Sequence, residues 1–371
     1  MIKVDLIAGA RPNFMKVAAL CAVASEFPEL LLRLVHTGQH YDEAMSEVFF
    51  KELGLPTPIT HLGSGSGTHA AQTALVMERY GTWIESNRPD MCMVVGDVNS
   101  TVACALVAAK EHIPVAHVEA GLRSFDRTMP EEINRIVTDA IADLLFVTEE
   151  SGVENLLREG RQREAIHLVG NVMIDTLFRM LPRALELRSW STFGLLPGAY
   201  AFVTLHRPSN VDDPQALAEI CDQLKWLAER LPVVFAVHPR TRARLEDLPG
   251  EASFPASVRL VDPLGYLDSL CLLAHARCVV TDSGGLQEET SALGVPCFTL
   301  RDNTERPITL TRGTNTLIAG DWKKFRAGVL QLIAGGERRE RKPIPFWDGH
   351  AAQRILAQCR TTWSRGEAMK L

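Results

Sequence analysis

The sequence lacks the patterns that mark secreted and membrane-bound proteins. Its eight cysteines show no CxxC spacing and mostly lie in apolar runs, which indicates buried, reduced thiols. No run approaches the roughly 20 apolar residues that a membrane-spanning helix needs. The first residues carry neither a charged segment nor a small-residue cleavage site, so we expect no signal peptide. These absences predict a cytoplasmic protein that does not contact a membrane.

Excess positive charge, metal-ligand spacing and a nicotinamide motif are missing as well. The 39 Lys and Arg residues against 45 Asp and Glu give a formal net charge of −6, which argues against a nucleic-acid partner. No His, Cys and Asp cluster has the spacing of metal ligands, and no GxGxxG motif follows the first apolar run. We therefore expect no metal and no cofactor.

What the chain does contain is a steady alternation of short apolar runs with amphipathic stretches. The candidate strands are residues 2–8, 31–36, 91–95, 113–118, 144–147, 165–169, 199–205, 232–237, 257–261, 277–281 and 295–300. The candidate helices are residues 13–26, 70–87, 99–111, 131–142, 174–189 and 214–230. Apolar rather than alternating strands indicate parallel sheets that are covered by helices on both faces. The pattern predicts an α/β protein.

Length and strand number divide the chain into two doubly wound domains. A chain of 371 residues is long enough for about two domains, and the strands fall into two sets of about six. We place the boundary near Gly170 and Asn171, so that residues 1–172 form the first domain and 173–348 the second. Ligands of such sheets bind outside the carboxyl ends of the strands. Two facing domains predict one cleft between them.

Residues 281–307 hold the most informative local pattern. An apolar run is followed there by a turn that contains Ser283, Gly284 and Gly285, and a helical pattern comes after the turn. Glycines let a ligand approach the backbone closely, and a helix N-terminus favours anions, so the segment is a candidate phosphate site. A purely structural turn is the alternative, because glycine pairs are common in turns.

The glutamates after this turn also have two interpretations. If the helix opens at Leu286, then Glu288 and Glu289 lie in its first turn, where the helix dipole favours negative charge. The alternative is that Glu289 reaches past the phosphates to a pair of sugar hydroxyls.

Two cations follow the first predicted strand. Arg11 and Lys16 lie at the expected start of a helix, where positive charge is unfavourable. They are either solvated or neutralised by an anion, and an anionic ligand explains them better.

Three carboxylates lie near the ends of predicted strands in the first domain. Asp97 follows residues 91–95, Glu119 follows 113–118, and Glu131 opens a helix. Helix capping or the helix dipole explains Asp97 or Glu131 individually. Together the three are expected to converge on one rim, and crowded carboxylates raise one another's pKa, which suits a group that holds and returns a proton. Arg135 has the spacing to pair with Glu131.

Basic residues follow the strands of the second domain. His206 comes after residues 199–205 and His238 after 232–237, and each is either a structural residue or a ligand. Arg306 is either a surface residue or a bidentate phosphate contact.

Motifs along the whole chain resemble one enzyme family. The chain contains, in order, GARPNFMK, TGQH, GDVNST, HVEAGLRS, PEEINR, LHRPSNVDD, SGGLQEE and RDNTERP. This series resembles the non-hydrolysing UDP-N-acetylglucosamine 2-epimerases. The resemblance implies a GT-B-like pair of Rossmann-type domains with an interdomain cleft, a final helix of about 349–371 that packs back on the first domain, and a homodimer.

The resemblance also implies an activity and residue roles. The expected reaction inverts C2 of a UDP-2-acetamido sugar by eliminating UDP to a 2-acetamidoglucal and adding it back. The implied catalytic residues are Asp97, Glu119, Glu131, His206 and Lys16. The implied substrate-binding residues are Arg11, Arg135, His238, Ser283, Gly284, Gly285, Glu289 and Arg306.

Four alternatives stay open at this point. A hydrolysing epimerase would release free sugar and UDP, and a glycosyltransferase or a non-catalytic sensor could use the same fold. The substrate could also be a UDP-2,3-diacetamido uronate, which the glycine- and serine-rich segment 63–72 could accommodate. Where some bacterial members have an arginine-containing turn and an Arg-Gln pair for substrate activation, this chain has Tyr41-Asp42 and Ala71-Gln72.

Overall fold

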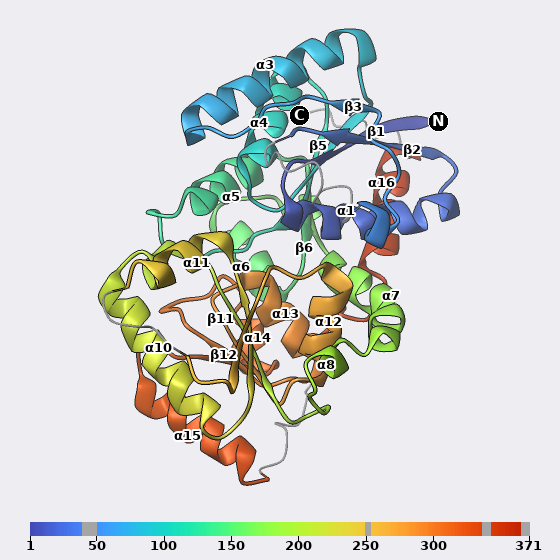
Figure 1. Cartoon of the computed structure of the whole chain (residues 1–371). Coiled ribbons are helices and arrows are strands. Elements are labelled where there is room, and N and C mark those ends of the chain that lie inside the picture. Colours follow the sequence, from blue (N-terminus) through green and yellow to red (C-terminus); the bar gives the residue numbers. More distant parts are fainter. Residues whose placement is uncertain (39–49, 249–253, 336–342, 365–371) are drawn as a thin grey trace. The chain divides into compact units, whose positions relative to one another are not determined.

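The chain forms two compact units, which Figure 1 colours by sequence. The computed structural model describes residues 1–38, 50–248, 254–335 and 343–364, without the side chains of Arg11 and Ser364. Unit 1 comprises Met1–Arg179 and Pro345–Leu371, and unit 2 comprises Met180–Ile344. Helix α7 (Val172–Leu187) spans the division, so the units part within this helix, whereas the sequence placed the boundary at its start.

Unit 1 is built on a parallel seven-stranded sheet. Its strands are β1 (Ile2–Ala8), β2 (Leu30–His36), β3 (Thr60–His61), β4 (Met91–Val95), β5 (Val115–Ala120), β6 (Leu144–Val147) and β7 (Ile166–Leu168). Their order in the sheet is β3-β2-β1-β4-β5-β6-β7. The first strand is thus central, and the chain winds outward from it twice, which is the doubly wound arrangement.

Helices cover both faces of this sheet. They are α1 (Arg11–Val23), α3 (His69–Asn87), α4 (Asn99–Lys110), α5 (Pro130–Ile141), α6 (Glu150–Arg158), α7 and α16 (Ala351–Ser364). Figure 1 shows α3, α4 and α5 on one face and α1 with α16 on the other. Helix α16 buries Ile355 and Leu356 completely, and burial of such a side chain contributes about 1.5–3 kcal/mol. Asp175 on α7 accepts a hydrogen bond from the Ala352 amide at 2.7 Å and so fixes the start of α16.

Unit 2 repeats the same winding with a parallel six-stranded sheet. Its strands are β8 (Ala201–Leu205), β9 (Val233–Val237), β10 (Val258–Val261), β11 (Cys278–Thr281), β12 (Cys297–Thr299) and β13 (Asn315–Leu317), in the order β10-β9-β8-β11-β12-β13. Its helices are α8 (Ser189–Thr192), α9 (Pro208–Val211), α10 (Pro214–Ala228), α11 (Pro239–Glu246), α12 (Tyr266–His275), α13 (Gly284–Leu293), α14 (Ile308–Thr311) and α15 (Trp322–Ile333).

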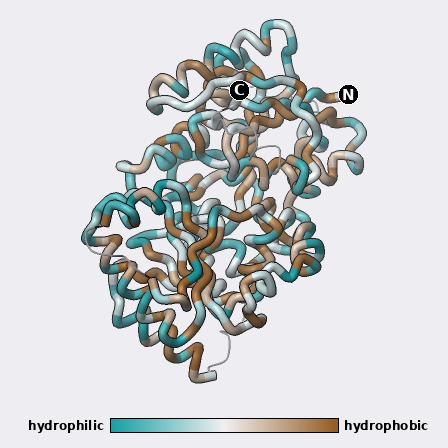
Figure 2. Tube along the Cα trace, in the orientation of Figure 1, coloured by the Kyte–Doolittle hydropathy of each residue, from teal (hydrophilic) through white to brown (hydrophobic). Residues whose placement is uncertain are grey.

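Each face of the second sheet has its own core. Val203 packs with residues of α10 and α15, whereas its neighbour Phe202 packs with residues of α12 on the opposite face. Successive side chains of a strand point to opposite faces, so both must be apolar when both faces are covered. Outer helices such as α10 bury mainly one side, and in Figure 2 the tube accordingly alternates between brown and teal along α10.

Most predicted strands and helices are present, and two short strands were missed. β3 and β13 lie at sheet edges and contain no apolar run long enough to be recognised. All eight cysteines are free thiols, and only Cys21 is not fully buried, as the sequence predicted. None of the helices within the described ranges is long and apolar enough to cross a membrane.

The two sheets place their switch points at equivalent strands. The strand order reverses between β1 and β4 in unit 1 and between β8 and β11 in unit 2. Ligands of open α/β sheets bind at the carboxyl ends of the strands at such points. The residues that follow these four strands are therefore the first place to look for a site.

Candidate active site

A pocket of about 440 Å³ opens at the switch point of unit 1. It is lined by residues that follow β1 and β4 and by the first residues of α1, α3, α4 and α5. The lining residues are Ala10, Pro12, Ser66, Gly67, His69, Gln72, Asp97, Val98, Asn99, Pro130, Glu131 and Asn134. Several helix N-termini therefore lie at one cavity that also carries two carboxylates. Asp97 and Glu131, predicted to act together, line the same space.

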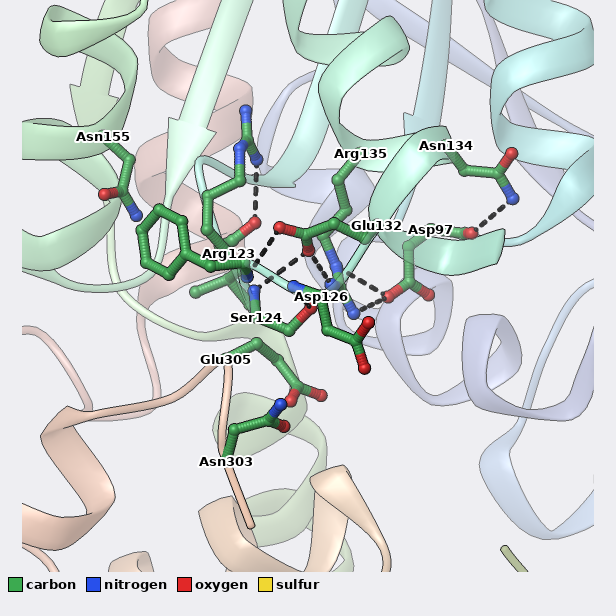
Figure 3. A network of polar contacts seen from close by, with 12 residues as sticks. Asp97, Arg123, Ser124, Asp126, Glu132, Asn134, Arg135, Asn155, Asn303 and Glu305 are labelled. Atoms are coloured by element: carbon green, nitrogen blue, oxygen red, sulfur yellow. Dashed lines mark hydrogen bonds and ion pairs between the residues drawn. The ribbon is translucent and has the colours of Figure 1, made fainter. Parts of the chain in front are cut away.

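Arg135 holds Asp97 in place (Figure 3). Its guanidinium, on α5, donates to Oδ2 of Asp97 from Nε at 3.0 Å and from Nη2 at 2.7 Å. Nη1 of the same group donates to Glu132 at 2.6 Å. Asn134 adds a hydrogen bond to the Asp97 carbonyl at 2.9 Å. The Asp97 carboxylate thus has a fixed direction before any ligand binds.

The pairing that the sequence predicted for Arg135 is wrong by one residue. Arg135 pairs with Glu132, three positions away, and not with Glu131. Glu132 is buried and also accepts from the Ser124 and Phe125 amides at 3.0 and 2.9 Å. Both spacings suit a helix, so spacing alone does not choose between neighbouring glutamates. Glu132 is therefore the glutamate that pairs with Arg135, and Glu131 is the one that lines the pocket.

Glu119 lies in a buried ion pair with Lys16. Their side chains are 4% and 7% exposed, and Nζ of Lys16 contacts Oε2 of Glu119 directly. The sequence placed Glu119 after its strand, but β5 continues to Ala120, and Glu119 occupies a bulge with φ of 78°. A non-glycine residue in the left-handed region is uncommon and marks a functional or strained position. The anion beside Lys16 is therefore one of the protein's own carboxylates.

Gly96 provides the space for this pair. It has φ of 67°, and a Cβ on it would lie 2.6 Å from Nζ of Lys16 and 3.3 Å from Oε2 of Glu119. Asn13, near the start of α1, ties this helix to the end of β4, because its side-chain amide donates to the Val95 carbonyl at 3.0 Å. Asp97 pairs with Arg135 and Glu119 pairs with Lys16, so each carboxylate has a cation beside it as well as the neighbouring carboxylates that the sequence predicted.

A fully buried histidine supports the same strand end. His117 Nε2 lies 2.8 Å from the Gly96 carbonyl, and Nδ1 lies 2.6 Å from Oδ1 of Asp139. Asp139 also pairs with Arg123 at 2.7 Å. Burial alone would raise the pKa of Asp139, but His117 and Arg123 outweigh it and hold that pKa below its usual value. His117 and Arg123 belong to the motif HVEAGLRS, but no pattern in the sequence marks Asp139 as their partner.

The switch point of unit 2 is organised by Asp282. Its buried carboxylate follows β11 and accepts from the amides of His206 and Arg207, which follow β8, at 3.1 and 2.9 Å. Asn210 donates to it at 3.0 Å, and Nδ1 of His206 lies 3.0 Å away. These hydrogen bonds outweigh burial and lower the pKa of Asp282. The histidine ring itself is 45% exposed.

Helix α13 begins earlier than the sequence predicted. It starts at Gly284 with Ser283 as N-cap, so Glu288 and Glu289 lie beyond its first turn and the dipole argument for them is wrong. In the described chain no side chain caps this helix, so its first amides are not satisfied by a cap. A Cβ on Gly284 would lie 2.8 Å from Nη1 of Arg306, which explains why glycine stands there.

Arg306 and Glu289 are both buried. Arg306 pairs with Glu288 at 2.7 Å and with Glu305, whose other oxygen accepts from Arg301 at 2.8 Å. Glu289 accepts from the hydroxyl of Tyr266 at 3.2 Å, and burial raises its pKa to about 7. Arg306 is thus not the exposed arginine that was the alternative.

His238 has a structural contact of its own. It is the N-cap of α11, and its Nδ1 accepts from the Arg240 amide at 3.2 Å. Arg240 pairs with Asp212 on the protein surface. The rings of His238 and His206 lie 6.0 Å apart between centroids, so both histidines stand at the same end of the sheet. The side chain of Arg11 lies outside the described part of the structure.

The fold and these two sites define an α/β protein of the GT-B-like class, with two Rossmann-like units and a polar site at each switch point. The family model for UDP-N-acetylglucosamine 2-epimerase matches residues 24–360. The chain therefore belongs to the UDP-N-acetylglucosamine 2-epimerase family.

Relatives that are 2-epimerases of UDP-sugars cover most of this chain. The enzyme of Methanocaldococcus jannaschii is 40% identical over 362 residues, which cover 96% of this chain and 98% of the relative. The enzyme of Escherichia coli K12 is 31% identical, with 96% and 97% covered. A UDP-2,3-diacetamido-2,3-dideoxy-D-glucuronate 2-epimerase of Pseudomonas aeruginosa is 41% identical over 321 residues, 85% of this chain and 88% of the relative.

Solved structures agree with the fold. The M. jannaschii UDP-GlcNAc 2-epimerase in complex with UDP-GlcNAc and UDP has a TM-score of 0.87 at 38% identity, covering 97% of this chain and 100% of that one. The Neisseria meningitidis enzyme bound to UDP-GlcNAc has a TM-score of 0.88 at 26% identity, with the same coverage.

Proposed function

We propose that the protein interconverts UDP-N-acetylglucosamine and UDP-N-acetylmannosamine by inversion at C2, without net hydrolysis. The observation that carries the proposal is the pocket in which Asp97, fixed by Arg135, and Glu131 face the same space at a sheet switch point. Positioned carboxylates are suited to removing and returning a proton. The relatives named for this reaction support it over their full length.

The chemistry proceeds by elimination and addition. A carboxylate takes the C2 proton, the C1–O bond to UDP breaks with its electron pair on the phosphate oxygen, and a C1=C2 double bond forms. The reverse addition places a proton on C2 from the opposite face while UDP rejoins C1. We assign the proton transfers to Asp97, Glu119 and Glu131 as a group, with Lys16 compensating the charge of Glu119.

UDP is assigned to the switch point of unit 2. The first amides of α13, at Gly284 and Gly285, have no side-chain cap and suit phosphate oxygens, and Ser283 is assigned to the same site. His206 is assigned to the diphosphate, and Glu289 to the ribose hydroxyls. Arg11, His238 and Arg306 complete the proposed binding set, with Arg306 held by Glu288 and Glu305.

Proton NMR of the protein with UDP-GlcNAc in D2O tests the proposal. We expect UDP-ManNAc to appear, with deuterium at C2 of both sugars. Free ManNAc together with UDP would refute the non-hydrolysing assignment. The variant Asp97→Asn tests the role of the carboxylate, because it keeps an acceptor for Arg135 but removes the base. We expect this variant to bind UDP without exchanging the C2 proton.

A second candidate substrate has its own observation. The P. aeruginosa relative, named for a 2,3-diacetamido uronate, is as similar to this chain as the archaeal enzyme is. The same NMR experiment with the UDP-2,3-diacetamido glucuronate separates the two. Turnover of the uronate but not of UDP-GlcNAc would move the assignment to that sugar.

A further inference from the structure

Asp282 has been given no role in the proposed function, although its carboxylate accepts several hydrogen bonds. Its side chain is completely buried. Oδ2 accepts from the Arg207 amide at 2.9 Å and from Asn210 at 3.0 Å, and both oxygens lie within 3.2 Å of the His206 amide. The contacts with the two backbone amides would be enough for a residue that only joins two strand ends.

The ring of His206 makes one more contact with this carboxylate. Nδ1 lies 3.0 Å from Oδ1, although the side chain is 45% exposed. An ionised carboxylate is only an acceptor, so the nitrogen that faces it must carry a proton. The hydrogen bond at one imidazole nitrogen determines the state of the other. Nε2 is therefore the nitrogen left to face a ligand.

We propose that Asp282 is a positioning residue that keeps Nδ1 of His206 protonated and so directs Nε2 at the diphosphate, to which Nε2 donates when it carries a proton as well. The identity of the ligand rests on the proposed function, but the ring state does not. Asp282 immediately precedes Ser283, which occupies the N-cap position of α13 but makes no capping hydrogen bond with its side chain. One buried carboxylate thus contacts the histidine and adjoins the start of the proposed anion site.

Nitrogen NMR tests the ring state without any assay of turnover. The protein is labelled with ¹⁵N on its histidine rings, and His206→Gln identifies the His206 signals by their loss. We expect the wild-type pattern of a protonated Nδ1, and we expect added UDP to move the Nε2 signal. A wild-type ring protonated only at Nε2 would overturn the proposal.

Variants test the role of the carboxylate. Asp282→Asn should lose the Nδ1-protonated pattern and lower kcat about 100-fold, with KM changed by less than about threefold. The matched control is Asp5→Asn, which neutralises another completely buried, hydrogen-bonded aspartate and should leave the ring pattern and kcat unchanged. An unchanged ring pattern in Asp282→Asn would reduce Asp282 to a tie between strands and refute the proposal.

Two further results keep the test decisive. If Asp282→Asn does not fold, Asn210→Ala removes another partner of the carboxylate, and it should keep the Nδ1-protonated pattern. Loss of that pattern in Asn210→Ala would contradict the role of Asp282. If the wild-type protein shows the expected ring state and UDP response but no epimerisation, the proposed function fails while the positioning role stands.

Discussion

The buried Lys16–Glu119 pair allows a quantitative test of how unit 1 holds its catalytic charges. Lys16→Met removes the ammonium group that contacts Glu119, whose side chain is only 4% exposed. Breaking a buried pair by removing one partner costs about 3–5 kcal/mol, because the remaining charge stays desolvated. Glu119→Gln should have a similar cost. The double variant removes both charges, so we expect it to be more stable than either single variant, or equal to the better one.

The expected coupling between the two positions is therefore about 3 kcal/mol. A protein of two units need not unfold in a single transition, so a global unfolding curve would not report on unit 1 alone. The assay is therefore hydrogen–deuterium exchange of the amides in β1, β4 and β5. The exposed pair Lys225–Asp222, 3.6 Å apart, is the matched control, and its cycle with Lys225→Met and Asp222→Asn should couple by less than about 1 kcal/mol. A Lys16–Glu119 coupling as small as this control would refute the reasoning.

Three other changes have expected outcomes of defined sign. Gly96→Ala should destabilise unit 1 by more than about 2 kcal/mol, since it combines the backbone strain of a φ of 67° with displacement of the buried Lys16 ammonium from Glu119. Gly160→Ala, with φ of 85° and open space, carries only the backbone strain of about 1 kcal/mol. Burial, with His61 beside the ring, lowers the pKa of His36 to about 4. The neutral ring therefore contributes to stability above pH 6.5, and this contribution is lost as the pH falls. Urea unfolding should show a loss of about 2 kcal/mol in the free energy of unfolding between pH 7 and 5, and this loss should be absent in His36→Phe. Burial raises the pKa of Glu289 to about 7, so wild-type stability falls as the pH rises above 4.5, and Glu289→Gln should be more stable in urea by about 3 kcal/mol at pH 8 but by less than about 1 kcal/mol at pH 5. Equal effects at both pH values would contradict either pKa assignment.

The sequence predicted the sheets well because buried parallel strands carry a strong signal. Strands β4 and β6 have the predicted bounds, since their apolar runs begin and end abruptly. β3 was not recognisable, because two residues at a sheet edge bury too little apolar surface to leave a pattern.

The site was less predictable, because contacts between distant segments determine it. Nothing in PEEINR distinguishes the glutamate that pairs with Arg135 from the one that lines the pocket; the Ser124 and Phe125 amides make that choice. The bulge that lets Glu119 reach Lys16 depends on neighbouring strands. Asp282 directly precedes the predicted glycine turn, but its contacts with His206 and Arg207 depend on the pairing of β8 with β11 in the fold.

The interrupted path of the chain has a consequence for synthesis on the ribosome. Unit 1 needs α16, whose Ile355 and Leu356 are completely buried, yet the ribosome makes all of unit 2 before it reaches this helix. At about 5–20 residues per second, residues 180–344 take roughly 10–30 s to synthesise. During that time the surface of α1 that contacts α16 in the folded protein waits for that helix. Unit 2 can therefore complete its fold during translation, while the core of unit 1 stays unfinished until the last helix is made.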